Sequence, residues 1–225
     1  MNPWVLLDSA QVPGNGGELR LYQRDDDYSI KIAGHGELMS TRVHGSEDAL
    51  AEHTCARLVD CVEPRLLIGG LGMGFTLAAA LRLAGEQAQV VVAELVPAVV
   101  EWNRGPLGIH AGHPLQDPRV LVREVDVARI LKNEQQAYDA ILLDVDNGPE
   151  GLTRRENDWL YSMNGLNAAY AALRPQGVLA IWSASPDRVF MQRLRKVGFD
   201  VDEVRVRARG KKGARHIIWF AKRIA

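Results

Sequence analysis

The chain has 225 residues, 47% of them hydrophobic, which is enough to bury a substantial core as one domain with a small appendage. Lysine and arginine total 27 against 28 acidic residues, so the net charge of -1 gives no general attraction to nucleic acid or an anionic membrane. The only cysteines, Cys55 and Cys61, have no histidine or cysteine nearby at a zinc-finger spacing. The first residues lack the pattern of a signal peptide, and no apolar run approaches a membrane span. We therefore expect a cytoplasmic protein with no metal site and no membrane partner.

Short alternating segments dominate the N-terminal part. GELRLYQ, YSIKIAG and ELMSTRV follow one another between residues 16 and 44, with turn signals in RDDD and GHG. They predict a small antiparallel β domain over residues 1–45. Ser46 is then expected to cap a helix, SEDALAEHTCARLVDCV, that ends before Pro64.

In residues 46–225 the spacing of apolar residues is different. Strongly apolar segments, predicted as strands at 65–70, 89–95, 119–126, 137–145 and 177–183, alternate with helical segments. Such strands are typical of a parallel sheet covered on both faces. Two last strands, 201–208 and 214–222, are joined by a glycine-bearing loop. The sequence therefore predicts an α/β fold with a doubly wound sheet ending in an antiparallel hairpin.

Ligands in such sheets bind at the carboxyl ends of the strands, so the residues that end each strand are the candidates for a site. The first strand ends in a glycine turn, and the next three end in carboxylates: Gly70, Gly72, Gly74, Glu94, Asp126, Asp144 and, two residues later, Asp146. Glycines let a ligand approach the backbone, and a carboxylate can accept from both hydroxyls of a ribose.

Each signal also has a plainer explanation. The glycines can form an ordinary tight turn, Glu94 or Asp126 can cap a helix, and Asp144 can be structural. Their recurrence at successive strand ends of one sheet favours a nucleoside site.

Two classes of nucleoside-binding enzyme could account for this pattern. Dinucleotide-binding dehydrogenases favour G-x-G-x-x-G and a second mononucleotide half. Here the turn is G-x-G-x-G, and the chain ends in a hairpin. These features resemble the class I S-adenosylmethionine-dependent transferases. That resemblance implies that the glycine turn passes the methionine portion of the cosubstrate, that Glu94 holds the ribose, and that Asp126 lies near the adenine.

Longer segments narrow the resemblance. The connecting helix with Ser46-Glu47 near its start, RLLIGGLGMG, VVVAELVPAVVEWN and YDAILLDVDNGPEGL together are similar to the spermidine synthase family, over most of the chain from Glu37 onward. The resemblance implies that Asp144 faces the acceptor. Asp146 is expected to tune the charge of Asp144, so we predict both as catalytic residues.

The acceptor site is less well marked. Carboxylates available for an amine include Glu47 and Glu52, and Trp182 is either a pocket residue or an ordinary core residue. We predict all three as candidates for substrate binding.

Departures from the family pattern affect the expected reaction. The Tyr and His that the family carries in the connecting helix, and the Asp of its glycine turn, are missing here. We therefore expect methyl transfer from S-adenosylmethionine to a small acceptor such as an amine. Aminopropyl transfer from decarboxylated S-adenosylmethionine to a polyamine is the alternative, and a non-catalytic nucleoside-binding protein is a second.

Partners can be predicted in part. The family resemblance and the exposed edges of a short antiparallel sheet indicate a homodimer through the N-terminal strands. The basic stretch RVRARGKKGAR is either a solvated hairpin or an anion site. Without interleaved aromatic residues it does not indicate nucleic acid.

Overall fold

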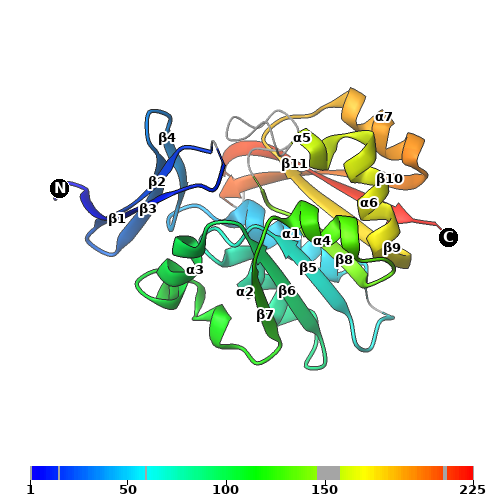
Figure 1. The fold of residues 1–225 in the computed structure, drawn as a ribbon, viewed down its shortest axis with the longest axis horizontal. Coiled ribbons are helices and arrows are strands. Elements are labelled where there is room, and N and C mark those ends of the chain that lie inside the picture. Colours follow the sequence, from blue (N-terminus) through cyan, green and yellow to red (C-terminus); the bar gives the residue numbers. More distant parts are fainter. Residues whose placement is uncertain (1, 15, 59, 146–157, 210–211, 225) are drawn as a thin grey trace.

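The computed structural model describes residues 2–14, 16–58, 60–145, 158–209 and 212–224. They form a four-stranded and a seven-stranded sheet, which Figure 1 shows at the left and in the body of the molecule. We call them the N-terminal sheet and the large sheet.

The N-terminal sheet is an antiparallel meander. Its strands, in spatial order, are β1 (Val5–Gln11), β2 (Glu18–Arg24), β3 (Asp27–Ile32) and β4 (Gly36–Ser40). The last three match the predicted strands. Strand β1 was not predicted, because VLLDSAQ is almost wholly exposed and shows no regular alternation of apolar and polar residues.

The large sheet has the order β10-β11-β9-β8-β5-β6-β7. Its central pairs are parallel, whereas β11 is antiparallel to both β9 and β10. The bounds of these strands are β5 Arg65–Gly69, β6 Gln89–Glu94, β7 Val120–Glu124, β8 Tyr138–Leu143, β9 Leu173–Ser183, β10 Phe199–Arg209 and β11 Lys212–Arg223. The predicted doubly wound sheet with a terminal antiparallel hairpin is confirmed.

Alternate residues of each central strand enter two separate cores. In β5, Leu66 and Ile68 pack with one set of helices, and Leu67 packs with the other. The first set comprises α1 (Gly45–Cys55), α2 (Phe75–Leu83) and α3 (Pro97–Arg104). The second comprises α4 (Val127–Asn133), α5 (Asp158–Tyr161), α6 (Met163–Ala172) and α7 (Arg188–Val197). Among the described helices, none has the length and apolar character needed to cross a membrane.

Helix α1 differs from its prediction at both ends. It starts after His44, which forms no side-chain cap, and it stops at Cys55, well before Pro64. Ser46 is not the cap, because its hydroxyl donates to the Glu47 carboxylate at 2.7 Å. The single helix predicted around residues 159–173 is divided at Ser162, whose Oγ accepts from the backbone N of Gly165 and caps α6.

Candidate functional site

The glycine turn forms the junction between β5 and α2. Gly70 has φ +91°, and a Cβ there would lie 2.6 Å from the backbone O of Asp144. Gly72 has φ +53°, and a Cβ there would lie 3.1 Å from Sδ of Met39, which belongs to β4. Glycine at these two positions therefore allows the end of β5 to touch both β8 and the N-terminal sheet.

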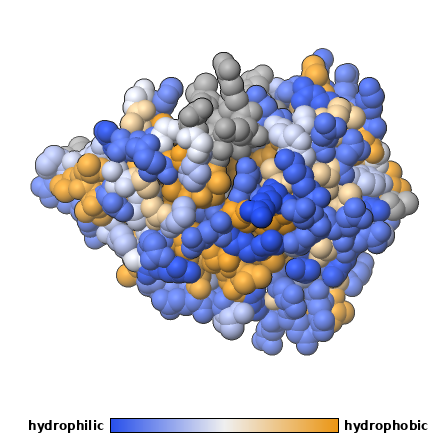
Figure 2. Space-filling view, viewed as in Figure 1, coloured by the Kyte–Doolittle hydropathy of each residue, from blue (hydrophilic) through white to orange (hydrophobic). Residues whose placement is uncertain are grey.

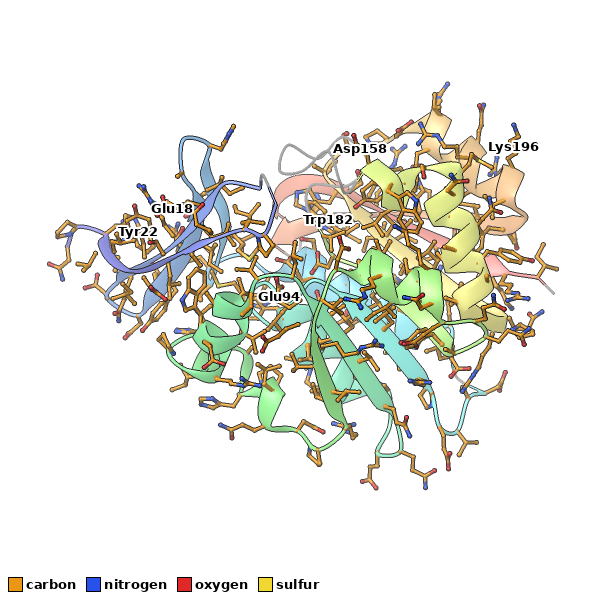
Figure 3. All side chains as sticks on the ribbon, in the orientation of Figure 1. Glu18, Tyr22, Glu94, Asp158, Trp182 and Lys196 are labelled. Atoms are coloured by element: carbon orange, nitrogen blue, oxygen red, sulfur yellow. The ribbon has the colours of Figure 1, made fainter. Side chains whose placement is uncertain are left out.

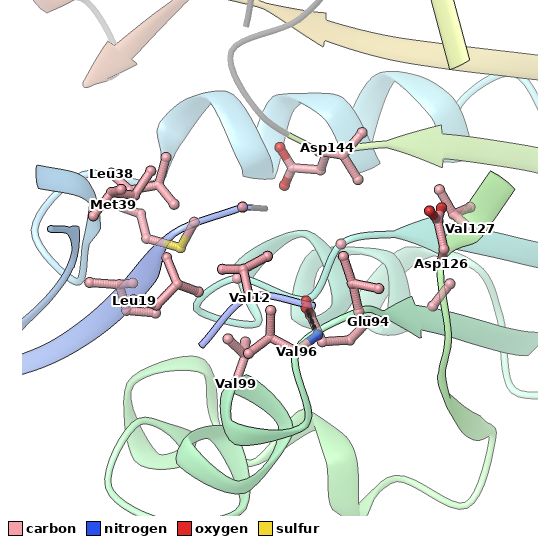
Figure 4. Close-up of a pocket in the computed structure, with 18 of the residues that line it drawn as sticks. Val12, Leu19, Leu38, Met39, Glu94, Val96, Val99, Asp126, Val127 and Asp144 are labelled. Atoms are coloured by element: carbon pink, nitrogen blue, oxygen red, sulfur yellow. Dashed lines mark hydrogen bonds between the residues drawn. The ribbon is translucent and has the colours of Figure 1, made fainter. Parts of the chain in front are cut away.

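Glu94 joins the glycine turn to the next strand end. Glu94 is 8% exposed, and its carboxylate accepts from the backbone N of Leu71 at 2.9 Å and from the backbone N of Val96 at 2.8 Å. Figure 4 shows the hydrogen bond to Val96. Burial raises the pKa of Glu94, and the backbone N–H groups that donate to it oppose that rise. Each carboxylate oxygen keeps further acceptor capacity, so Glu94 is still able to accept from hydroxyls of a ligand.

A cavity of about 140 Å³ opens beside Glu94, between the large sheet and the N-terminal sheet. We call it the first cavity. It is mainly apolar, with Glu94, Asp126 and Asp144 as the carboxylates; its other lining residues are Val12, Gly16, Leu19, Ile30, Ile32, Leu38, Met39, Gly70, Gly72, Ala93, Leu95, Val96, Val99, Val125, Val127 and Val145. Figure 4 shows residues from both sheets around it, and Figure 2 shows a hollow bordered by apolar residues near the middle of this face.

The Asp126 side chain caps a helix and also borders the first cavity. It is the N-cap of α4, accepting from the backbone N of Ala128 at 2.8 Å, and it also lines the first cavity. The plainer explanation from the sequence, a helix cap, is therefore confirmed, and the same side chain lies where a ligand would contact it.

A second cavity, of about 600 Å³, adjoins the first and shares Leu38, Met39, Gly72 and Asp144 with it. Its remaining lining residues are Glu37, Ser40, Val43, Ser46, Glu47, Leu71, Met73, Phe75, Thr76, Trp182, Ala184 and His216. Small-molecule sites have volumes of roughly 300–1,000 Å³, so the second cavity has this size and the first is smaller. A larger ligand held by Glu94 would therefore extend past Gly72 and Asp144 into the second cavity.

Asp144 and Glu47 both line the second cavity, and the charge of Asp144 acts on Glu47. Thr76 Oγ1 donates to Asp144 Oδ2 at 2.7 Å. Burial raises the pKa of Asp144, and burial together with the nearby charge of Asp144 raises the pKa of Glu47 to about 7. A carboxyl group whose pKa is raised to about 7 by burial and a neighbouring carboxylate is a feature common in acid–base sites.

Trp182 of β9 and His216 of β11 lie on neighbouring strands of the large sheet, and both line the second cavity. Their rings meet edge to face, with centroids 4.7 Å apart. Trp182 Nε1 and His216 Nδ1 are buried and have no hydrogen-bond partner among the described residues. Burial lowers the pKa of His216, so its imidazole is neutral at neutral pH. Figure 3 shows Trp182 and Glu94 near the middle of the molecule, between the N-terminal sheet and the body of the large sheet.

Most predicted site residues meet at these cavities. Gly70, Gly72, Glu94, Asp126 and Asp144 line the first, and Glu47 and Trp182 line the second. Gly74 lines neither and is the N-cap of α2. Asp146 lies outside the described residues.

Glu52 does not join them. It is exposed on α1 and lines neither cavity. Five residues along a helix turn the side chain by about 140° from that of Glu47, so both cannot face one pocket. The prediction of Glu52 as a binding residue is corrected by this geometry.

Met39, Thr76 and His216 are among the lining residues that were not predicted. Thr76 follows Gly74 by two residues and is the one with a local signal, a hydroxyl at the start of a helix. Within the described ranges, no group of three or more His, Cys, Asp and Glu side chains is arranged to hold a metal ion.

Known proteins resemble this chain in sequence and in fold. No family model matches the chain. The polyamine aminopropyltransferase of Oceanobacillus iheyensis is 29% identical over 173 residues, which are 75% of this chain and 32% of that protein. The match thus spans about a third of the relative's length.

Solved structures show the same fold at low sequence identity. Spermidine synthase from Thermotoga maritima has a TM-score of 0.75 at 18% identity, over 96% of this chain and 72% of that chain. The Burkholderia thailandensis 1,6-didemethyltoxoflavin-N1-methyltransferase, bound to S-adenosylhomocysteine, has a TM-score of 0.58 at 18% identity, over 81% of this chain and 80% of that one. The class I methyltransferase-like fold and the predicted resemblance to spermidine synthase-like transferases are confirmed.

Proposed function

We propose that the protein transfers a methyl group from S-adenosylmethionine to a small amine acceptor. The observation that carries this proposal is the placement of Glu94 and Asp144 in adjoining cavities that meet at Gly72. The nucleoside would lie in the first cavity, and the acceptor in the second. We propose the cytoplasm as its location, where the free thiols of Cys55 and Cys61 stay reduced.

The nucleoside part of the proposal rests on the first cavity. Glu94 lies beside the glycine turn, where its carboxylate can accept from ribose hydroxyls. Asp126 borders the same cavity from the next strand end, and valines at and before the starts of α3 and α4 offer apolar surface to a base. The relative matched in sequence and the neighbours matched in structure are transferases, which supports a transferable group on this nucleoside.

The transfer step needs little covalent help from the protein. A sulfonium is already electrophilic, so the enzyme must align the nucleophile with the transferred carbon and exclude water. A neutral amine attacks the carbon, the carbon–sulfur bond breaks, and the nitrogen loses a proton. Asp144, between the two cavities, is placed to orient the amine and accept that proton.

Aminopropyl transfer from decarboxylated S-adenosylmethionine is the competing reaction, favoured by the similarity to a polyamine aminopropyltransferase. Methyl transfer is supported by the glycine turn, whose side chains Leu71 and Met73 are apolar and offer no carboxylate to a free ammonium tail. The N-terminus of α2, beginning at Phe75, favours the carboxylate that only the undecarboxylated cosubstrate carries. Product mass after incubation with each cosubstrate separates the two reactions.

The first prediction concerns nucleoside binding. Glu94→Gln replaces one acceptor oxygen by an amide group that cannot accept from a hydroxyl or a backbone N–H. We expect the affinity for S-adenosylhomocysteine, measured by calorimetry, to fall about tenfold or more. Glu101→Gln on the exposed side of α3 is the matched control and should bind as the wild type does. Equal affinity in Glu94→Gln, with an unchanged melting temperature, would contradict the nucleoside assignment.

The second prediction concerns the reaction step. Asp144→Asn keeps the size and the acceptor for Thr76 Oγ1 but removes the charge and the proton acceptor. Turnover of an amine acceptor should fall about a hundredfold or more, while nucleoside affinity persists. Asp139→Asn, near the opposite end of β8, is the control and should leave turnover near that of the wild type. Wild-type turnover in Asp144→Asn would mean that this carboxylate is structural.

The third prediction concerns pH. The proton acceptor, Asp144, must be ionised, and burial raises its pKa, so the rate should fall as the pH drops through that raised pKa. Glu47→Gln removes the negative charge beside Asp144, which lowers the pKa of Asp144 and shifts the acid limb to lower pH. Rate profiles of both proteins with the same acceptor test this. An unshifted acid limb would show that the two carboxylates titrate independently.

We also propose that the protein is a homodimer through residues 1–45, which we regard as a separate β domain. β1 pairs with β2 along one edge, its other edge is unpaired in the described residues, and Val5, Leu6 and Leu7 are 56%, 49% and 43% exposed. Figure 2 shows apolar residues at this end of the molecule. An open strand edge bearing apolar side chains favours pairing with a second copy.

The fourth prediction tests that dimer. Light scattering should give the mass of two chains, and Leu6→Lys should give the mass of one, because a charge would be buried at the interface. Val62→Lys changes an apolar residue of 81% exposure away from the N-terminal sheet and should stay dimeric. A wild-type monomer over a wide concentration range would overturn the proposal.

A further inference from the structure

The hydroxyl of Thr76 forms its hydrogen bond outside its own helix. Thr76 lies in the first turn of α2, two residues after Gly74, and is 3% exposed. A threonine hydroxyl in a helix often donates to a carbonyl one turn earlier, as Thr54 Oγ1 in α1 donates to the O of Leu50 at 2.6 Å. Thr76 Oγ1 instead donates to Asp144 Oδ2 at 2.7 Å. This hydrogen bond therefore joins the start of α2 to the residue that follows β8.

The start of α2 gives no local reason for a threonine at position 76. Gly74 is the N-cap of the helix, and no side chain caps it. Threonine forms helices less readily than alanine or leucine, and a buried hydroxyl costs free energy unless it is hydrogen-bonded. The bond to Asp144 satisfies this hydroxyl. Thr76 is therefore better explained by its contact with Asp144 than by the helix.

The hydrogen bond occupies one oxygen of the Asp144 carboxylate and leaves the other. Among the described residues, no group donates to Oδ1 of Asp144. Asp144 lines both cavities, and Figure 4 shows its carboxylate directed toward the side on which Leu38 and Met39 lie. A carboxylate that is held through one oxygen rotates less, so its other oxygen keeps a fixed direction.

Resting on the proposed function, we propose that Thr76 is a positioning residue for Asp144: its hydroxyl holds Oδ2, so that Oδ1 is kept for the amine of the acceptor. A hydrogen bond to a carboxylate also favours its ionised form, which is the form that can accept the proton of the amine. Burial raises the pKa of Asp144, and the hydroxyl of Thr76 opposes that rise. Thr76 takes no proton itself and acts through Asp144.

Other ionisable groups share the two cavities with Asp144. In the described part of the chain they are Glu37, Glu47, Glu94, Asp126 and His216. The charge of Asp144 acts on Glu47, so the titrations of these two carboxyl groups are linked. A comparison in which residue 76 alone changes keeps the residue at every other position the same, including positions 146–157. A difference in the titration of Asp144 between two such proteins is then due to residue 76.

The test measures the titration of Asp144 directly and needs no acceptor. The full chain, labelled with 13C at its aspartate carboxyl carbons and saturated with S-adenosylhomocysteine, is titrated by NMR; the Asp144 signal is the one missing in Asp144→Asn. Thr76→Val removes the O–H at nearly constant size, so we expect the titration midpoint of Asp144 to move about one pH unit higher. Thr76→Ser keeps the O–H and should keep the wild-type midpoint. Thr76→Ala is a second variant that lacks the hydroxyl and should behave as Thr76→Val does.

The matched control is Thr54→Val. It also removes a buried hydroxyl from a helix, but one that bonds within that helix, so it should leave the titration of Asp144 unchanged. Crystal structures with S-adenosylhomocysteine test the positioning itself. The Asp144 side chain should adopt one conformation in the wild type and in Thr76→Ser, and more than one in Thr76→Val.

The outcomes separate this inference from the proposed function. An unchanged midpoint in both Thr76→Val and Thr76→Ala, an equal shift in Thr54→Val, or a single Asp144 conformation in Thr76→Val would each overturn the inference while nucleoside binding persists. Failure of the wild type to bind S-adenosylhomocysteine, or wild-type turnover in Asp144→Asn, would instead refute the proposed function, and the inference with it.

Discussion

The contact between the backbones of Gly70 and Asp144 is the constraint on which the site depends. The backbone N of Asp144 donates to the O of Gly69 at 3.0 Å, and a Cβ on Gly70 would lie 2.6 Å from the Asp144 O. With no side chain between them, the end of β8 lies directly against the glycine turn. Glu94 then holds the other side of the turn through the backbone N of Leu71. The ends of β5, β6 and β8 thereby lie around the glycine turn.

The N-terminal sheet is part of the site, because it closes the first cavity opposite the strand ends. Leu38 and Met39 from β4 line both cavities, and Met39 Sδ lies against Gly72. A hydrogen bond of 2.7 Å from Trp102 Nε1 to Asp8 joins α3 to β1 and helps to hold the sheet there. A cavity of about 140 Å³ is small for a nucleoside with an amino-acid tail, so binding requires the N-terminal sheet and the turn to separate slightly or the tail to enter the second cavity.

The second cavity has an acidic region at Glu47 and Asp144 and a region without carboxylates at Trp182 and His216. Burial disfavours ionisation of both Glu47 and Asp144, and the charge of Asp144 also disfavours ionisation of Glu47, so their placement here costs free energy. Hydroxyl groups of Ser46 and Thr76 offset part of that cost. Trp182, beside Asp144 on the next strand, contributes no charge.

The sequence by itself determined the elements whose signals are local. The N-cap Asp126 and the apolar period after it define α4, Val127–Asn133, and the apolar runs ending at Glu94 and Asp144 define central strands. Because parallel strands end at a common edge, those carboxylates could be assigned to one site. Only the tertiary structure decided what meets them there. It added His216, which has no motif, and Thr76, whose local signal is only a hydroxyl at the start of a helix. It removed Glu52, which the helix turns toward solvent. Strand β1 depends on pairing with β2, and the surroundings of Trp182 depend on packing between β9 and β11. Local sequence patterns do not record such contacts between elements.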